Sequence, residues 1–552
     1  MRKQTKLVAV LSTAALLAIG ASMTSFAAQG WAEEDGTWVY YNKDGDKATD
    51  TWKKSGDNWY WLDDGGEMAT DMLIEDDDNY YYVDANGAMV RNQWVAVENE
   101  DAGEDDEPDH YWYYFQSNGK AYKRSDNASD KSISAKTING KKYAFDTEGR
   151  MLYGWVSEGE RQTDDDAWKN AEYYFGDEDD GAMSSGWRLI NLTDDEYESL
   201  QPGDEYWDEE QDRWFYFQAS GKKVAADDGK ILKTKTINGK KYGFDEDGRM
   251  VSSWNAKLSA ASLSTVEASQ NNAKYAHEFM YFSTPEDGAR YTKGWFKVVP
   301  GYYLEEDEYN DGSDSWYYAD GDGQIYASVI ENIKGKKYAF NENGRMIDGL
   351  VFLEMNDSKN ISEVIDDDNY DTEENFDEYV TDEAIAASIA KGDIRCYYFG
   401  DGDDGAMKTG KQTVSIDGES FTFKFKTSSS TKGSGIVGED DHKLYNAGKL
   451  VKADSDDKYQ VVAFDTVNKT SKKMDVEDFL KLGIVHEVTE TEKGYDKDAT
   501  TWTVTQGDKD ETVYYLVNTS GSMLKKKSNA KDGDDYKFTT DNYKITKIVL
   551  ED

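Results

Sequence analysis

The chain is poor in cysteine and histidine. Of its 552 residues, one is cysteine and four are histidine. A single cysteine excludes an intramolecular disulfide, and we expect Cys396, within the strand-like run Arg395–Phe399, to be a small buried apolar residue rather than a nucleophile. The histidines show no metal-ligand spacing, and no zinc motif, Cys-His pair or nucleophile elbow is present. We therefore expect no catalytic site.

Positive charge is also scarce. Lys and Arg number 63 against 111 Asp and Glu, so the formal net charge is −48 at pH 7. Such a surface repels nucleic acid and anionic lipid head groups, and it favours neutral or cationic partners. Apolar residues make up only 38% of the chain, whereas aromatic residues reach 14%, with 39 Tyr and 16 Trp. We expect a thin core built largely from aromatic rings.

Long apolar runs are confined to the N-terminal region. Three basic residues precede an apolar run over residues 7–21, and small residues follow up to Ala28. This layout predicts a secretory signal peptide over residues 1–28, because the run is short for a bilayer span. No second run of spanning length follows, so we expect an exported protein with no membrane span after signal cleavage.

What the chain does contain is repetition. The segment Lys136–Trp155 (KTINGKKYAFDTEGRMLYGW) recurs at Lys235–Trp254 (KTINGKKYGFDEDGRMVSSW) and at Glu331–Leu350 (ENIKGKKYAFNENGRMIDGL). A Trp that opens an aromatic run recurs with nearly the same spacing, at Trp112, Trp214 and Trp316. Two markers with one spacing indicate a duplicated block of roughly a hundred residues.

Shorter units occupy residues 30–94. Each has an aromatic strand, an Asx-Gly turn and a second short strand with Met and often Trp, as in Trp38–Gly45, Trp59–Gly66 and Tyr80–Gly87. This pattern is typical of β-hairpins, in which Gly supplies the positive φ of the turn. Because one hairpin is marginally stable alone, we expect neighbours to stack and bury their ring faces. The predicted fold is all-β: a repetitive β-hairpin solenoid with acidic, partly helical insertions and a degenerate C-terminal β region.

The predicted organisation has four parts. Residues 1–28 are the signal peptide, 29–94 the N-terminal repeats, 95–410 the three-hairpin blocks, and 411–552 either degenerate repeats or a small β domain. Acidic insertions are expected between hairpins at 156–172, 255–278 and 351–395, and inside a block at 191–212. We interpret them as solvated loops, with a protein-binding role as the alternative. Short helices are expected over 259–274, 382–391 and 474–482.

The unit W-x-x-x-x-G-x-W-Y-Y-x-x-x-x-G-x-M, clearest from Trp31 to Trp94, resembles the cell-wall-binding (choline-binding and glucan-binding) repeats of Gram-positive surface proteins. The resemblance implies a β-solenoid whose adjacent hairpins form aromatic cages around a quaternary ammonium. It also implies a secreted or cell-wall location and, as partners, teichoic-acid choline or wall glycan. The cage residues that it implies are Trp31, Trp38 and Tyr60; Trp52, Trp59 and Tyr81; Trp94, Trp112 and Tyr143; Trp187, Trp214 and Tyr242; and Trp295, Trp316 and Tyr338.

Several alternatives stay open at this point. Each ring could be core packing rather than part of a site, and stacking on sugars is possible in place of a cation. The solenoid could instead be a stalk that displays the acidic insertions to protein partners. Asp-rich turns such as Asp177–Gly181, Asp320–Gly323 and Asp401–Gly405 could offer oxygens to Ca²⁺, although they lack EF-hand spacing. No other cofactor is expected.

Overall fold

The computed structural model describes residues 29–103, 107–125, 128, 133–194, 209–256, 276–302, 304–488, 499–507, 510–532 and 535–550. The predicted signal peptide and the helix expected over 259–274 lie outside these ranges. The chain divides into two compact units: Met1–Arg188 with Tyr216–Lys223, and Leu189–Phe215 with Val224–Asp552. This division falls inside the predicted 95–410 block.

The first unit is a series of antiparallel hairpins. Its strands are β1 Gly30–Glu34, β2 Thr37–Tyr41, β3 Thr51–Ser55, β4 Asn58–Leu62, β5 Met72–Asp76, β6 Asn79–Val83, β7 Gln93–Glu98, β8 His110–Phe115, β9 Lys136–Ile138, β10 Lys141–Tyr143, β11 Trp155–Ser157, β12 Glu160–Arg161 and β13 Tyr173–Tyr174. A single turn of helix, α1 Ala167–Asn170, lies between β12 and β13. Strands β14 Gly186–Asp194 and β15 Glu209–Phe217 follow at the division between the units. The predicted hairpins form separate sheets of two or three strands.

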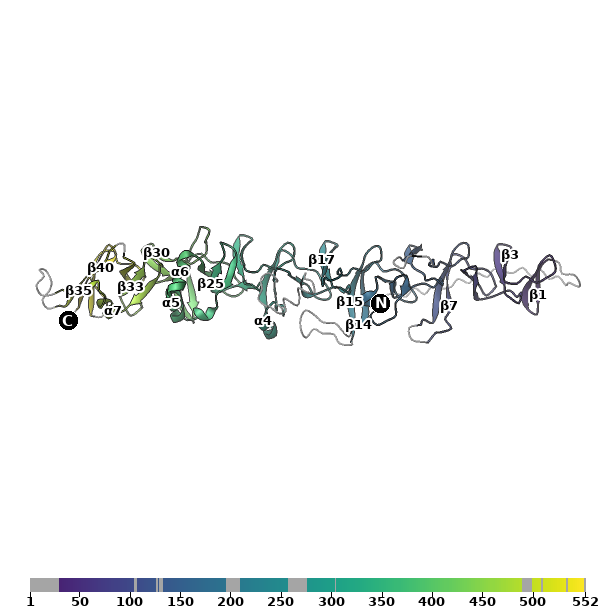
Figure 1. Cartoon of the computed structure of the whole chain (residues 1–552), viewed down its shortest axis with the longest axis horizontal. Helices are drawn as coiled ribbons and strands as arrows, with labels where there is room; N and C mark the ends of the chain where they lie inside the picture. The colour runs from purple at the N-terminus through teal and green to yellow at the C-terminus, as the bar shows by residue number, and fades with distance from the viewer. Residues whose placement is uncertain are drawn as a thin grey trace. The chain divides into compact units, whose positions relative to one another are not determined.

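The second unit begins with the same kind of hairpins. Its strands up to residue 399 are β16 Lys233–Ile237, β17 Lys240–Phe244, β18 Ser253–Ala256, β19 Phe279–Phe282, β20 Gly294–Val298, β21 Ser315–Ala319, β22 Val329–Ile333, β23 Lys336–Phe340, β24 Met346–Ile347, β25 Gly349–Met355, β26 Ile361–Val364 and β27 Ile394–Phe399. The helices here are α4 Glu306–Asp311, η1 Asp367–Asn369, α5 Glu373–Thr381 and α6 Glu383–Lys391. Figure 1 shows α5 and α6 beside β25.

Larger sheets replace the small hairpins after residue 410. A five-stranded sheet contains β28 Gly410–Ile416, β29 Glu419–Phe425, β30 Gly438–Asp440, β31 Lys443–Asn446 and β32 Lys449–Leu450. An eight-stranded sheet contains β33 Tyr459–Asp465, β34 Ser471–Met474, β35 Val485–Glu487, β36 Thr501–Val504, β37 Thr512–Asn518, β38 Lys527–Lys531, β39 Tyr536–Asp541 and β40 Lys544–Leu550. Helix α7 Val476–Leu480 begins after Asp475, where the sequence predicts a short helix.

Backbone hydrogen bonds link many of the hairpins to a following one. The amide of the residue that follows a turn donates to a carbonyl on the outer strand of an earlier hairpin. In the first unit these bonds are Met68 N to Trp38 O (2.8 Å), Met89 N to Trp59 O (2.8 Å), Ala121 N to Tyr80 O (2.8 Å) and Met151 N to Trp112 O (2.7 Å). In the second they include Met250 N to Trp214 O (2.7 Å) and Met407 N to Lys337 O (2.8 Å). These bonds hold successive hairpins in a constant register within each unit.

The recurrent Gly and Met of the repeat pack against each other. Gly119 has a φ of +87°, and a Cβ added there would lie 2.2 Å from Sδ of Met89, which belongs to the preceding hairpin. Gly181 faces Met151 and Gly405 faces Met346 in the same way, each at 2.3 Å. The turn glycine therefore serves two purposes, because it adopts a left-handed conformation and leaves room for a methionine side chain.

A Gly119→Ala substitution is expected to destabilise the protein more than Gly140→Ala does. Both glycines have nearly the same positive φ, +87° and +85°, but a Cβ on Gly140 meets nothing within 4 Å. Both variants bear the strain of a left-handed alanine, and Gly119→Ala adds overpacking of roughly 1–3 kcal/mol. Urea unfolding of the two variants measures the difference. Equal losses would show that the contact with Met89 contributes nothing.

The structure corrects the predicted place of the insertions. Trp155 pairs with Tyr174, Trp254 with Tyr281 and Leu350 with Tyr398. The insertions at 156–172, 255–278 and 351–395 therefore join the two strands of one hairpin, and they do not separate one hairpin from the next. This arrangement is tolerated because the entropy of closing a loop rises only slowly with its length.

The insertion over 351–395 is also not a solvated loop. Phe352, Phe376, Val380 and Ile389 are buried in one cluster with Phe423 of the five-stranded sheet. Helix α6 confirms the helix expected over 382–391: the side chain of Asp382 accepts hydrogen bonds from its first turn, and Gly392, at a φ of +86°, ends it. The apolar side chains of both helices supply a core that the acidic composition of this segment hides.

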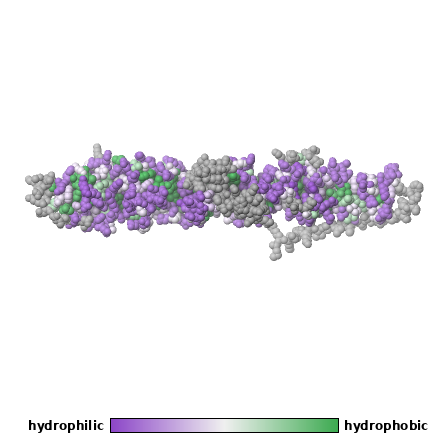
Figure 2. Space-filling model, turned by 60° about the horizontal axis from the view of Figure 1, so that its bottom comes forward, coloured by the Kyte–Doolittle hydropathy of each residue, from purple (hydrophilic) through white to green (hydrophobic). Residues whose placement is uncertain are grey.

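Cys396 lies in the same cluster and is 2% exposed, as the sequence predicts. On the face shown in Figure 2, hydrophilic residues predominate and the apolar areas are small and separate. Within the described residues, no helix is long and apolar enough to cross a membrane.

Candidate aromatic ligand-binding sites

In several hairpins a Trp on the first strand faces an aromatic ring on the partner strand. Trp31 packs on Tyr40 (ring centroids 5.4 Å apart), Trp94 on Tyr114 (5.2 Å) and Trp295 on Tyr318 (5.1 Å), all nearly edge to face. These pairs are direct cross-strand neighbours in the antiparallel register. The contact is therefore set by hairpin pairing, and it orients the Trp before any neighbouring hairpin is added.

Two of the predicted ring sets have nearly the same geometry. In the first unit, the Trp94 ring lies 6.5 Å from Trp112 at 85° and 4.8 Å from Tyr143 at 64°. In the second unit, the Trp295 ring lies 6.2 Å from Trp316 at 88° and 4.7 Å from Tyr338 at 66°. In each set, two indoles meet at a right angle while a tyrosine from the next hairpin supports the first indole.

The supporting side of each set is apolar core. Trp94 stacks on Phe145 at 5.8 Å and Trp295 on Phe340 at 5.7 Å. Tyr143 is 8% exposed, and burial raises the pKa of its phenol. The four indoles themselves are only half-buried. The core thus holds one side of each set rigidly and leaves indole surface in contact with solvent.

A carboxylate contacts the second indole of both sets. Trp316 Nε1 donates to Asp403 Oδ1 at 2.8 Å, and Trp112 Nε1 donates to Asp179 Oδ1 at 3.4 Å. Hydrogen bonds from Lys297 and from Trp316 hold the pKa of Asp403 below its usual value, so this carboxyl is ionised at neutral pH. Each corner of indoles therefore has a negative charge at its edge.

The two sets differ in the residues around the second indole. Across the hairpin from Trp316 lies Lys297, whose Nζ is 2.9 Å from Asp403 Oδ1 and 5.9 Å from the centroid of the Trp316 ring. Across from Trp112 lies Ala96, which has no charge. On the other side of Trp112, the His110 ring lies 5.4 Å away, and its Nε2 is 3.3 Å from Asp179 Oδ1. The Trp295 set thus contains a lysine ammonium, whereas the Trp94 set has an alanine at the equivalent position.

The two N-terminal sets are only partly assembled. Trp31 contacts Tyr60 at 5.4 Å and Trp52 contacts Tyr81 at 5.1 Å, whereas no ring contact joins Trp38 or Trp59 to them in the described part of the chain. Trp59 is 37% exposed. Here too a carboxylate meets an indole, because Trp52 Nε1 donates to Asp76 Oδ2 at 3.1 Å.

The remaining predicted set is divided between the two units. Trp187 belongs to the first unit, where its ring lies 5.2 Å from Tyr216. Trp214 and Tyr242 belong to the second unit, where Trp214 accepts a backbone hydrogen bond from Met250 at 2.7 Å and Tyr242 pairs with Lys235. The grouping of these three residues stays a prediction.

Trp254 occupies the same position in its hairpin as Trp94 and Trp295 do in theirs, but its indole is part of the core. It is 3% exposed, lies between Tyr281 at 5.3 Å and Tyr317 at 4.9 Å, and donates from Nε1 to the backbone oxygen of Val299 at 2.8 Å. Its indole is thus buried on both sides and hydrogen-bonded to the backbone. This contrast distinguishes a core tryptophan from the half-buried tryptophans of the Trp94 and Trp295 sets, which we call the matched sets.

Sequence reasoning missed two groups of site residues. One group consists of the rings that lie across the hairpin from the first Trp, such as Tyr114 and Tyr318. Counting residues outward from the hairpin turn on both strands could have identified these cross-strand partners. The other is the pair Asp179 and Asp403, which come from equivalent Asp-rich turns two hairpins further along the chain. The sequence suggested these turns only as calcium ligands.

The Asp-rich turns use many of their carboxylates internally. Asp177 Oδ1 accepts from the amides of Asp179 and Asp180, and Asp320 Oδ1 accepts from those of Asp322 and Gln324. Among the described residues, the carboxylates close enough together to share a metal ion are instead those of Asp366, Asp367 and Asp368, all exposed. Calcium binding at the predicted turns stays untested.

Comparison with known proteins identifies the repeats. Residues 48–94 match the family model described as choline-binding repeat. The chain is 26% identical over 278 residues to glucosyltransferase-S of Streptococcus mutans, a match that covers 43% of this chain and 16% of that protein. The chain carries repeats of the cell-wall-binding family of Gram-positive surface proteins, and it spans about one sixth of the length of this curated relative.

Solved structures of Streptococcus pneumoniae proteins are also similar. The modular autolysin LytC in complex with a synthetic peptidoglycan ligand is 16% identical, with 59% of this chain and 55% of that chain covered and a TM-score of 0.29. CbpJ is 18% identical, with 58% of this chain and all of that chain covered and a TM-score of 0.24.

Proposed function

We propose that this chain is a non-catalytic, wall-associated protein of a Gram-positive bacterium whose aromatic hairpins bind choline carried on wall polymers such as teichoic acid. In this proposal the hairpins continue as a solenoid, residues 1–28 direct export, and repeats hold the protein at the wall. The coarser function, binding to a cell wall or its carbohydrate, rests on the family of the repeats.

The observation that carries the choice of choline is the pair of perpendicular indoles with a carboxylate at its edge. Two ring centroids 6.2–6.5 Å apart allow one compact cation to lie within about 6 Å of both faces. A methylated ammonium needs no hydrogen-bond acceptor, and each desolvated cation–π contact contributes up to roughly 2 kcal/mol. The net charge of −48 adds a general attraction for cations.

Wall glycan is the second ligand class considered. A pyranose ring stacks best on one flat, open aromatic face, and the right angle between the two indoles restricts such a face. Trp59, which is 37% exposed, offers a more open ring for such a contact. The geometry therefore favours choline at the Trp94 set, where Ala96 lies across from Trp112. At the Trp295 set Lys297 already supplies the cation, and a sugar contact is left to single exposed rings.

The absence of catalysis remains part of the proposal. His110 lies beside Trp112, His277 Nδ1 is 3.0 Å from the backbone oxygen of Ile325, and His442 stacks on Tyr543 at 4.7 Å. These histidines occupy different places, and the carboxylates that two of them contact, Asp179 beside His110 and Glu439 beside His442, are exposed. Such contacts support a binding role better than acid–base chemistry.

A competition experiment tests the proposal. The mature protein is expected to sediment with purified choline-bearing walls, and free choline should release it because choline occupies the ring corners. Soluble glucan at the same concentration is the control. Release by glucan and not by choline would replace choline with a sugar ligand. Sedimentation that neither compound affects would favour the adhesive stalk, and failure to sediment would remove the wall-binding function altogether.

A further inference from the structure

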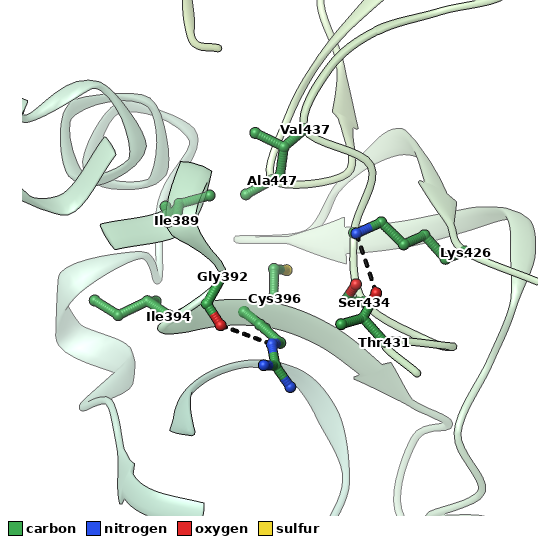
Figure 3. A pocket seen from close by; sticks show the side chains of 11 residues that line it. Ile389, Gly392, Ile394, Cys396, Lys426, Thr431, Ser434, Val437 and Ala447 are labelled. Atoms are coloured by element: carbon green, nitrogen blue, oxygen red, sulfur yellow. Dashed lines mark hydrogen bonds between the residues drawn. The ribbon is translucent and has the colours of Figure 1, made fainter. Parts of the chain in front are cut away.

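A small cavity in the second unit is lined by an unusual set of polar groups. It lies between the end of α6, strand β27 and the loop that connects β29 to β30 (Figure 3). Its volume is about 40 Å³, which exceeds the roughly 10–15 Å³ needed for one water. It is far smaller than the roughly 300–1,000 Å³ typical of organic ligands. The cavity therefore suits water or a single small ion.

Lys426 extends into this cavity without a carboxylate partner. Its Nζ donates to Thr431 Oγ1 at 3.3 Å, and within the described residues no carboxylate forms an ion pair with it or contributes to the shift of its pKa. Burial, followed by the positive charge of Arg395, lowers the pKa of Lys426. In a chain with a net charge of −48, a half-buried ammonium paired only with a hydroxyl is an exception.

Ser434 supplies a second donor. Its side chain is 3% exposed, and its Oγ has no hydrogen-bond partner among the described residues. Its backbone groups are occupied, since its amide donates to Thr431 O and its carbonyl accepts from Lys426 N. Figure 3 shows the hydroxyls of Ser434 and Thr431 on the same side of the cavity as the Lys426 ammonium.

The other charged groups near the cavity already have hydrogen-bond partners. Arg395 Nε donates to Gly392 O at 2.8 Å, and its Nη1 donates to Asp357 O at 2.9 Å. The Asp357 carboxylate accepts from the amides of Lys359 and Asn360. Burial raises the pKa of the Cys396 thiol, which therefore stays neutral. None of the residues that line the cavity is acidic.

We propose that this cavity binds a monatomic anion of the chloride class, held by Lys426 Nζ and by the hydroxyls of Ser434 and Thr431. An anion satisfies the unpartnered Ser434 hydroxyl and compensates the ammonium that burial makes costly. All three groups belong to the 426–434 segment, which forms one side of the cavity, while β27 and the end of α6 form the other. The site shares no residue with the aromatic sets, so a test of anion binding is independent of the proposed binding of choline.

Crystals of the mature protein soaked in sodium bromide test the proposal directly. The expected result is an anomalous difference peak in the cavity, within hydrogen-bonding reach of Lys426 Nζ and Ser434 Oγ. A cavity with density but no anomalous signal would contain water and would overturn the proposal.

A solution experiment tests the same site through stability. When gluconate, which is too large for the cavity, replaces chloride at equal ionic strength, the apparent Tm of the wild-type protein is expected to fall by roughly 2–4 °C. Lys426→Met should lose this dependence and Ser434→Ala should weaken it. Lys481→Met, which removes an exposed lysine paired with Asp478, should retain it. If Lys426→Met does not fold, Ser434→Ala decides, and a full chloride dependence in that variant would contradict the proposal.

Discussion

Exchanging one residue between the matched ring sets should move choline binding from one to the other. Lys297→Ala is expected to add one choline site per chain, and Ala96→Lys is expected to remove one. Lys297 lies over the Trp316 ring and neutralises Asp403, so it occupies the place and the charge that a choline headgroup needs. A lysine introduced opposite Trp112 meets Asp179 in the same way.

The size of this effect follows from the cation–π contact. A loss of roughly 2 kcal/mol corresponds to about a thirtyfold weaker affinity, which removes a site from a titration at moderate choline concentration. Equilibrium dialysis with labelled choline gives the stoichiometry for each variant. Lys336→Ala, which removes an exposed lysine of β23, is the matched control and should leave the count unchanged. Identical stoichiometry in all four proteins would contradict the assignment of these sets as choline sites.

Two tryptophan substitutions are expected to have opposite consequences. Trp112→Ala should weaken choline binding at its set about thirtyfold, since it removes one wall of the corner, with a modest loss of stability. Trp254→Ala should leave choline binding unchanged but destabilise the second unit by roughly 3–5 kcal/mol, because that indole is buried between rings and bonded to Val299.

Urea unfolding and equilibrium dialysis of both variants provide the comparison. The pair is informative because one substitution is made at a half-buried indole and the other at a buried one. If Trp112→Ala lowers stability as much as Trp254→Ala and leaves choline binding intact, the Trp94 set is core packing and no ligand site.

The local structure was largely predictable because it depends on neighbours in sequence. Asx-Gly turns between aromatic runs correctly indicated the hairpins, and Asp382 with Gly392 correctly delimited α6. The contacts of Trp94 and Trp295 with a tyrosine of the next hairpin follow the same repeat. At the Trp94 set, the backbone hydrogen bond from Met151 N to Trp112 O transfers the register of one hairpin to the next.

Other features depend on which hairpins meet in space. Acidic composition suggested that residues 351–395 form a solvated loop, but Phe376 and Ile389 bury the apolar face of two helices against another sheet. The roles of Asp179 and Asp403 were missed because their indole partners lie 67 and 87 residues away in the chain.

The sequence by itself determined the hairpins, their rings and the positions that repeat, since turn chemistry and strand alternation act over a few residues. Only the tertiary structure decided which indoles are buried like Trp254 and which stay accessible like Trp112. It alone also brought Asp403 to Trp316 and Asp179 to Trp112. The physical reason is that burial and charge pairing at these corners come from hairpins that are distant in the chain and meet only when they pack.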